Sequence, residues 1–319
     1  MSSMENTDRT GPIEHTDPSA AATNWTQHAE RSSLWVLRLM VWISLHLGRT
    51  LARWVLYPIA AYFLLFAPKA RKASRDYLSR ALGRKPGLAD LFQHIFCFAS
   101  TIHDRLYLLN ERFDLFDLTI KGEAQLLAAM NNGNGIFLIG AHLGSFEVMR
   151  CMGRLTGMDI AMVMYEENAR KINATLSAIN PAAIQDIIPL GRLESMLQVK
   201  ARLEQGAAIG FLADRALSTD TMRAIPFLGR PANFSDGPWR MAAMLRRPVF
   251  FMVGLYRGGN RYAVSFVPLA DFSGMTSAQV KEALPAAQNR YVALLEECCR
   301  QAPDNWFNFF DFWQEGKVG

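Results

Sequence analysis

The run Gly135-Ile136-Phe137-Leu138-Ile139-Gly140 places four consecutive apolar residues between two glycines. An unbroken apolar run of this length predicts a strand of a parallel sheet that is buried on both faces. The next residues, Ala141-His142-Leu143-Gly144-Ser145-Phe146-Glu147, bring an imidazole and a carboxylate directly after the carboxyl end of this strand. Ligands of open α/β sheets bind at that edge, so we expect His142 at the rim of a functional site.

The spacing of His142 and Glu147 predicts a turn followed by a helix. Gly140 and Gly144 supply the backbone freedom for the turn, and Ser145 is a candidate helix N-cap. Glu147, in the first helical turn, would then fold back onto His142. A carboxylate on one imidazole nitrogen raises the basicity of the other nitrogen, which can deprotonate a hydroxyl. The alternative is a structural histidine, with Glu147 complementing the helix dipole.

Apolar runs and helical patterns alternate along the rest of the chain. We predict strands over 135–141, 159–165, 184–190, 207–214, 249–256 and 262–269, and helices over 89–110, 192–205, 237–245 and 277–300. Such alternation indicates an α/β fold in which a mostly parallel mixed sheet is flanked by helices. The last two strands are expected to form a hairpin across Gly258-Gly259-Asn260.

Composition divides the 319 residues into three parts. Residues 1–30 are polar and are expected to be a disordered tail, without the charged and apolar leader of a secreted protein. Residues 31–85 carry eleven Lys or Arg and one acidic residue, or +10 of a chain whose net charge is +5. We predict basic, amphipathic and hydrophobic helices in this part, and an α/β domain over 86–319.

The apolar part of this basic region is too short for an unbroken transmembrane helix. Residues 54–67 are rich in aliphatic and aromatic side chains, but they number fourteen and include Pro58, whereas a span requires about twenty residues. Interfacial or re-entrant insertion is therefore favoured over a single span. The basic residues that follow suit an anionic membrane surface. A core helical hairpin with a solvated basic face is the alternative.

Other classes of partner are not indicated. No nucleic-acid-binding motif accompanies the basic residues, so we expect no nucleic acid. The four cysteines are Cys97, Cys151, Cys298 and Cys299. They have neither metal-ligand spacing nor the pattern of a disulfide framework, and they suit a reducing compartment. We predict no metal and no cofactor.

Further candidate site residues follow the later strands. Asp214 ends an apolar strand in the same way as His142, so both side chains are expected at one cleft, with Arg215 as an anion clamp. Residues 216–235, which include Phe227 and Gly229, have the length and composition of a substrate-binding loop. Tyr165 ends another predicted strand and is a further lining candidate. A structural Asp-Arg pair, a structural loop and an ordinary strand end are the respective alternatives.

With these motifs the chain resembles the bacterial lysophospholipid acyltransferase superfamily, in the branch of the lipid A lauroyl and myristoyl acyltransferases. His142 and Glu147 match the H-x4-D/E element of the superfamily, Asp214-Arg215 is similar to the Asp-Gln/Arg element, and Pro226-Phe227-Leu228-Gly229 to the Phe-Phe-Gly element. The likeness extends over roughly residues 31–313. Two departures are the missing Pro-Glu-Gly-Thr block and the end segment 306–313, which differs from the Trp- and Arg-rich close of the lipid A enzymes.

The resemblance implies a glycerol-3-phosphate acyltransferase-like fold and a membrane-associated O-acyltransferase. His142 and Glu147 would form a general-base dyad for the hydroxyl of a lipid or glycolipid acceptor. Acyl carrier protein, or alternatively acyl-CoA, would supply the acyl thioester. Substrate-binding roles would fall to Gly144, Ser145, Tyr165, Asp214, Arg215, Phe227 and Gly229, with Arg215 or amides near Gly144 at the oxyanion.

The implied location is the cytoplasmic face of the bacterial inner membrane. Two other functions remain open from the sequence. One is a non-catalytic lipid-binding protein on the same fold. The other is a membrane-associated lipid hydrolase, against which the missing nucleophile elbow counts, because Gly144-Ser145-Phe146 lacks the flanking pattern of G-x-S-x-G.

Overall fold

The computed structural model describes residues 30–133, 135–148, 153, 157–165, 187–190, 193–215 and 221–313. The chain divides into two compact units, residues 1–48 and 49–319. Of the first unit, the described part is the beginning of α2 (Glu30–Phe66), a helix broken at the non-helical Gly48. The predicted tail therefore lies, except for Glu30, outside the described residues, as do Cys151 and the predicted strand residues 184–186.

The second unit is built on a seven-stranded sheet of order β1-β9-β8-β2-β5-β3-β4. All neighbouring strands in it are parallel except the antiparallel pair β8 and β9. The strands are β1 (Asp117–Lys121), β2 (Ile136–Gly140), β3 (Ile160–Tyr165), β4 (Ile187–Leu190), β5 (Ala208–Leu212), β8 (Pro248–Tyr256) and β9 (Arg261–Asp271). The predicted α/β fold with a mostly parallel mixed sheet is confirmed, including the hairpin across Gly258-Gly259-Asn260.

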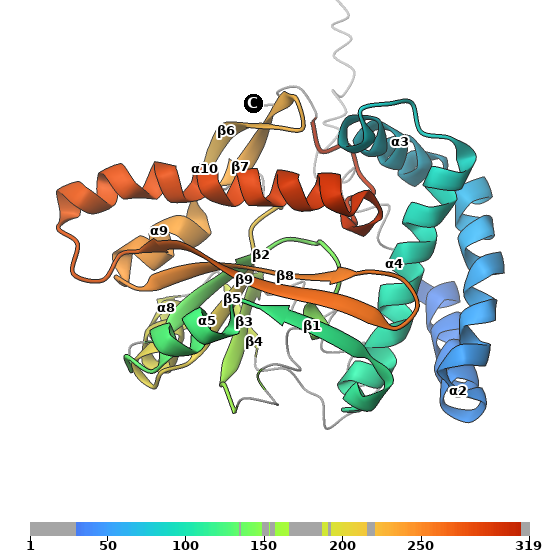
Figure 1. Cartoon of the computed structure of the whole chain (residues 1–319), viewed down its shortest axis with the longest axis horizontal. Helices are drawn as coiled ribbons and strands as arrows, with labels where there is room; N and C mark the ends of the chain where they lie inside the picture. Colours follow the sequence, from blue (N-terminus) through green and yellow to red (C-terminus); the bar gives the residue numbers. More distant parts are fainter. Residues whose placement is uncertain are drawn as a thin grey trace, which may run out of the picture. The chain divides into compact units, whose positions relative to one another are not determined.

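Helices flank this sheet on both sides (Figure 1). On one side lie α9 (Gly237–Met244) and the long α10 (Ser277–Gln301), and on the other α5 (Glu123–Met130) and α8 (Leu193–Glu204). At one end, α3 (Pro68–Leu82) and α4 (Leu88–Leu109) pack on each other and on the short turn η3 (Pro303–Asn305). A further short turn, η1 (Phe113–Leu115), leads into β1.

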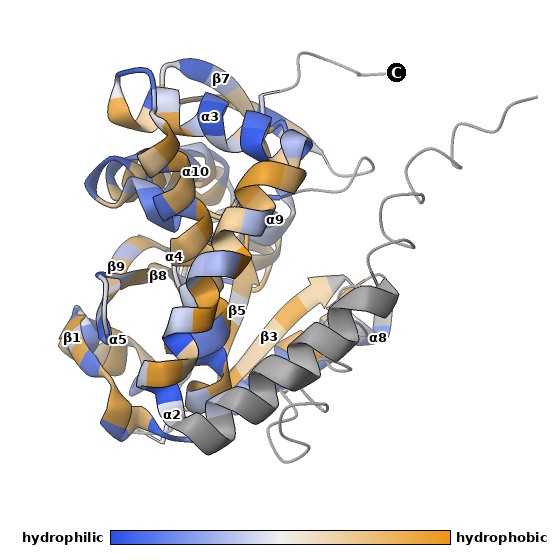
Figure 2. Ribbon diagram, turned by 90° about the vertical axis from the view of Figure 1, so that its right-hand side faces the viewer, coloured by the Kyte–Doolittle hydropathy of each residue, from blue (hydrophilic) through white to orange (hydrophobic). Residues whose placement is uncertain are grey.

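The central strands of the sheet are buried, as the apolar runs in the sequence predict. Every residue of β2 is buried, and so are the first four residues of β5. The strands β3 and β5 show the colours of apolar residues along their length (Figure 2). Because β2 and β5 are parallel neighbours, their carboxyl ends lie at the same edge, which places the residues that follow them side by side.

Residues 222–235 of the predicted substrate-binding loop form a β-hairpin, which the sequence analysis did not predict. The antiparallel strands β6 (Met222–Phe227) and β7 (Arg230–Ser235) are joined by Leu228 and Gly229, with φ of 50° and 82°. Two positive φ values in a two-residue connection are typical of the tight turns that match strand twist. Residues 216–220 of the predicted loop lie outside the described residues.

Among the described residues, no single helix has the length and hydropathy needed to cross a membrane. The segment 48–66 of α2 together with α3 meets the test only as a pair, which is bent by 95° at its break. Pro68 begins α3 directly after this bend.

Candidate active site

His142 and Asp214 meet at the edge where β2 and β5 end. The imidazole Nδ1 of His142 lies 2.8 Å from Asp214 Oδ1, and the backbone N–H of His142 donates to both carboxylate oxygens at 3.1 and 3.0 Å. The side chain of His142 is 31% exposed, whereas that of Asp214 is fully buried. With Nδ1 held by a carboxylate, Nε2 is the nitrogen left for a substrate.

The environment of Asp214 keeps its carboxyl group ionised. Burial by itself raises the pKa, but the electrostatic interaction and hydrogen bond with His142, with smaller contributions from Arg215 and Trp306, lower the pKa to about 2. The indole N–H of Trp306 donates to Asp214 Oδ2 at 2.9 Å. A buried carboxylate with three donor groups is a fixed anion, and it stabilises a positive charge on His142.

This arrangement differs from the prediction, in which Glu147 held His142. Within the described part of the chain, the imidazole pairs with Asp214 and with no other carboxylate. Glu147 forms an ion pair with Arg105 of α4 at 2.6 Å and accepts a hydrogen bond from Ser145 Oγ at 3.5 Å. The physical reason is that Glu147 lies in the helical turn after the loop, where it faces α4 rather than the carboxyl end of β5.

The loop between His142 and Glu147 is fixed by its backbone. Gly144 has φ of 69°, its N–H donates to Asn305 O at 2.8 Å, and the N–H of Ser145 donates to Gly254 O at 2.8 Å. A Cβ on Gly144 would lie 2.1 Å from Gly254 O, so only glycine fits. Both amides are occupied, which leaves neither of them for the oxyanion role that the resemblance implied.

Arg215 faces the segment 306–313, whose part in the site the sequence analysis missed. Its Nη2 donates to Phe307 O at 3.0 Å and its Nε to Asn308 Oδ1 at 3.2 Å, while the guanidinium lies over the ring of Phe310. Phe307 in turn donates its N–H to His142 O at 2.8 Å. The signal in the sequence was the dense aromatic pattern of this segment, which follows the last predicted helix.

The remaining predicted residues are more distant from this chemistry. Phe227 is fully buried and packs edge-on against Trp306 at 5.2 Å between ring centroids, so it supports the site from behind. Gly229 lies exposed in the β6–β7 turn. Tyr165 ends β3, and its side chain lies outside the described residues, as does the neighbouring Glu166.

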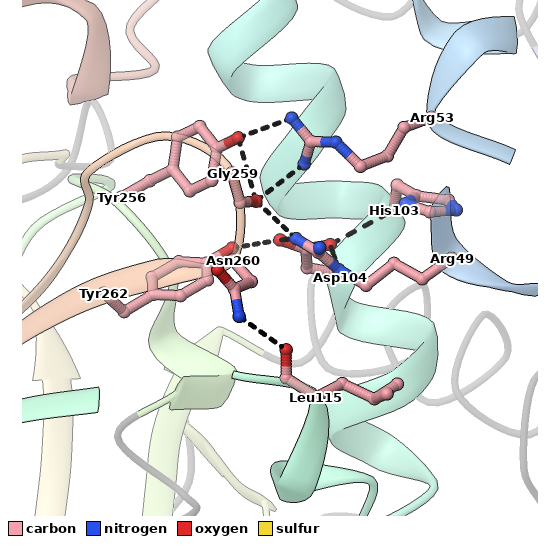
Figure 3. A network of polar contacts seen from close by, with 9 residues as sticks. All are labelled: Arg49, Arg53, His103, Asp104, Leu115, Tyr256, Gly259, Asn260 and Tyr262. Atoms are coloured by element: carbon pink, nitrogen blue, oxygen red, sulfur yellow. Dashed lines mark hydrogen bonds and ion pairs between the residues drawn. The ribbon is translucent and has the colours of Figure 1, made fainter. Parts of the chain in front are cut away.

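A second polar cluster lies on α2, α4 and the β8–β9 connection (Figure 3). Arg49 binds Asp104 through two hydrogen bonds of 2.8 and 2.9 Å, and Tyr262 donates to the same carboxylate at 2.8 Å. Both Arg49 and Arg53 donate to the backbone oxygen of Gly259. The Asp104 carboxylate is fully buried and has its charge paired, so we assign this cluster to holding α2 and α4 on the hairpin.

The described residues also form a surface groove away from His142. A groove of about 700 Å³ lies between β6 and α10, lined by Ile225, Pro226, Asn289, Ala293, Glu296, Glu297, Arg300 and Gln301, and it contains none of the predicted site residues. No group of three or more His, Cys, Asp or Glu residues in these ranges is arranged to hold a metal ion.

Comparison with known proteins identifies the family. A family model described as bacterial lipid A biosynthesis acyltransferase matches residues 23–315, which include the whole sheet and the His142–Asp214 pair. Comparison with curated proteins gives no match. The proteins of this family are typically membrane-associated. From the extent of the family match we conclude that this chain belongs to the bacterial lipid A biosynthesis acyltransferases and is an acyltransferase.

Proposed function

We propose that this acyltransferase moves a fatty acyl group from an acyl thioester to a hydroxyl of a lipid A-like acceptor, with His142 as general base. The observation that carries the proposal is the hydrogen bond between His142 Nδ1 and the buried, ionised Asp214. A carboxylate at Nδ1 keeps the proton on that nitrogen, so Nε2 presents a lone pair. The partial exposure of His142 allows a substrate hydroxyl to reach it.

The reaction is a direct transfer. Nε2 of His142 takes the proton of the acceptor hydroxyl while the hydroxyl oxygen attacks the thioester carbonyl, and Asp214 stabilises the imidazolium. The C–S bond then breaks, and the leaving thiolate takes the proton from His142. The product is an ester, and the thiol carrier is released. No covalent enzyme intermediate is required.

Arg215 is the candidate for stabilising the negative oxygen of the tetrahedral intermediate. Its Nε and Nη2 are fixed by Asn308 and Phe307, and its Nη1 makes no hydrogen bond within the described ranges. A guanidinium held in this way donates to an oxyanion without reorganising. The amides of Gly144 and Ser145 are excluded from this role because each already has a backbone acceptor.

We place the enzyme at the cytoplasmic face of the inner membrane, with α2 and α3 at the lipid surface. Large apolar side chains project from residues 49–66 into solvent, among them Trp54, Leu65 and Phe66, which are 65–68% exposed. Exposed basic residues follow on α3, including Lys69, Lys72 and Arg75. Figure 2 shows these hydrophilic stretches of α3 in blue. This succession suits an apolar layer below anionic headgroups.

Acyl carrier protein is the preferred donor in this proposal. It is an acidic protein, and the net charge of +5 of this chain gives it electrostatic complementarity, which raises association rates. Acyl-CoA is the competing donor. Both carry the acyl group as a thioester, so the chemistry at His142 is the same.

The test is acyl transfer by the full-length chain in detergent. Radiolabelled acyl groups on acyl carrier protein or on coenzyme A are offered with a lipid A-type precursor, and the lipid products are separated by chromatography. Labelled ester from wild type but not from His142→Ala supports the proposal, and Asp214→Asn should lose more activity than Glu147→Gln. Equal transfer by wild type and His142→Ala would contradict it, and fatty acid released without acceptor would indicate a hydrolase.

Membrane docking has a separate test with a matched control. Flotation with vesicles of phosphatidylglycerol should recover wild type, and Trp54→Ser should be recovered less. Leu197→Ser is the control, because Leu197 is a similarly exposed apolar residue (61%) on α8. Equal recovery of the two variants would place the membrane contact elsewhere.

A further inference from the structure

Both oxygens of Asp214 accept the backbone N–H of His142, but their side-chain partners differ. Oδ1 lies 2.8 Å from His142 Nδ1, and Oδ2 accepts the indole N–H of Trp306 at 2.9 Å. An indole nitrogen can donate a hydrogen bond but cannot accept one. Trp306 therefore fixes the plane of the carboxylate and dictates that an acceptor, never a donor, occupies the Oδ2 position.

Trp306 is itself held from several sides. It is fully buried, its backbone forms an antiparallel bridge with Leu143 of the His142 loop, and its ring meets those of Tyr77 and Phe312 at centroid distances of 4.9 and 4.8 Å. These contacts join Trp306 to α3, to the loop that follows His142, and to the end of its own segment. The ring cannot turn away from Asp214 without displacing its neighbours.

The backbone of Trp306 is anchored by a buried histidine. His94 Nε2 lies 2.9 Å from Trp306 O, and Ser74 Oγ lies 2.7 Å from His94 Nδ1. A carbonyl oxygen only accepts, so Nε2 must carry the proton and Nδ1 must accept from the Ser74 hydroxyl. Burial lowers the pKa of His94 to about 4, which keeps this neutral tautomer at physiological pH.

We propose that Trp306, anchored by His94, is a positioning residue of the reaction: it orients Asp214 toward His142 through its indole N–H. The inference rests on the proposed function, because it assumes that His142 acts as the base. It assigns no contact with substrate to Trp306 or His94. It predicts that both affect the rate through Asp214.

The first test compares Trp306→Phe with Trp313→Phe. Trp313 is the matched control, since its ring packs in the same aromatic cluster and its indole donates to the backbone oxygen of Phe227 at 3.4 Å, not to a catalytic group. Loss of a hydrogen bond to a charged group should lower kcat about tenfold, with KM within about twofold. Without the indole donor, Asp214 attracts the proton of His142 more strongly. In a plot of kcat/KM against pH, the acidic limb, where activity falls as the pH decreases, should therefore move to higher pH.

Trp313→Phe should lower thermal stability but leave the pH of this limb unchanged. Equal kcat losses in the two variants, with an unmoved acidic limb in both, would overturn the proposal. Loss of activity in Trp306→Phe then reports packing rather than orientation.

A second test uses the effect of Trp306 on an amide at position 214. In Asp214→Asn the indole donor forces the amide oxygen to the Oδ2 side, so the NH2 group faces His142 Nδ1 and imposes the wrong tautomer. In Trp306→Phe the amide can turn over. The loss caused by Asp214→Asn should therefore be smaller in the Trp306→Phe background. A loss of the same size in both backgrounds would overturn the proposal.

If Trp306→Phe does not unfold cooperatively, His94→Gln and His94→Leu replace it. Glutamine can donate to Trp306 O and accept from Ser74, whereas leucine can do neither. The leucine variant should lose kcat and shift the acidic limb, and the glutamine variant should do neither; identical kinetics for both would overturn the proposal. The variant His142→Ala distinguishes failure of the proposed function from failure of this inference. If His142→Ala retains full acyl transfer, the proposed function is wrong. If His142→Ala is inactive while the Trp306 and His94 variants behave like wild type, only the positioning role of Trp306 is wrong.

Discussion

His94→Gln should make the stability of this protein less sensitive to acid. His94 is buried, and burial lowers its pKa from the ordinary histidine value of 6.5 to about 4. The unfolded chain therefore binds a proton at this position before the folded chain does. The contribution of neutral His94 is fully present above about pH 6.5 and is lost as the pH falls toward 4.

The size of this effect follows from the difference between the two pKa values. At about 1.4 kcal/mol per pKa unit, the full loss is about 3 kcal/mol, of which about 2 kcal/mol has occurred by pH 5. Glutamine reproduces both hydrogen bonds of the neutral imidazole but does not titrate. The free energy of unfolding of His94→Gln should thus approach or exceed that of wild type on acidification.

The assay is urea unfolding followed by tryptophan fluorescence at pH 7.5 and pH 5. Asp304 titrates in the same range with the opposite sign, because burial and the nearby Asp90 raise its pKa to about 6, but it is present in both proteins and cancels in their difference. Asp304→Asn is a control, and its stability should fall more steeply with acid than that of wild type. A difference between wild type and His94→Gln that does not change with pH would refute the reasoning.

Two further substitutions test the loop and the second polar cluster. Gly144→Ala should lower the melting temperature and reduce acyl transfer at least about a hundredfold. The reason is that a left-handed φ costs about 1–2 kcal/mol for a residue with a side chain and that the added Cβ would lie 2.1 Å from Gly254 O. Acyl transfer at the wild-type rate would contradict this prediction. Asp104→Asn leaves Arg49 without its anion, so the melting temperature should fall by about 10 °C. Asp114→Asn, in an exposed ion pair, should leave the melting temperature unchanged, and equal shifts would contradict the assignment.

The sheet and the position of His142 could be predicted because both depend on local patterns. Unbroken apolar runs mark buried parallel strands, and the residues after β2 and β5 must lie at their carboxyl ends. The strand β1 was missed, since its five residues alternate only between exposed and partly buried positions at the edge of the sheet. The β6–β7 turn was missed because Leu228 adopts a positive φ that leucine seldom takes.

The sequence predicted that Asp214 shares a cleft with His142, but it assigned the imidazole to the wrong carboxylate, Glu147. Asp214 holds the imidazole because β2 and β5 are neighbours in the sheet, although β3 and β4 lie between them in the sequence. Glu147 is nearer in sequence, but the path of the chain after Gly144 turns it toward Arg105. Trp306 belongs to a segment without regular periodicity, so only its contacts reveal that it completes the site.

The long sequence separation of Trp306 has a consequence for the order of events during synthesis. Trp306 follows Asp214 by 92 residues, and the strands β8 and β9 and the helix α10 come between them. His142 and Asp214 therefore emerge from the ribosome well before the indole that fixes their geometry. The hydrogen bond between Trp306 and Asp214 is thus one of the last contacts of the site to form, because it requires a segment that is synthesised after α10.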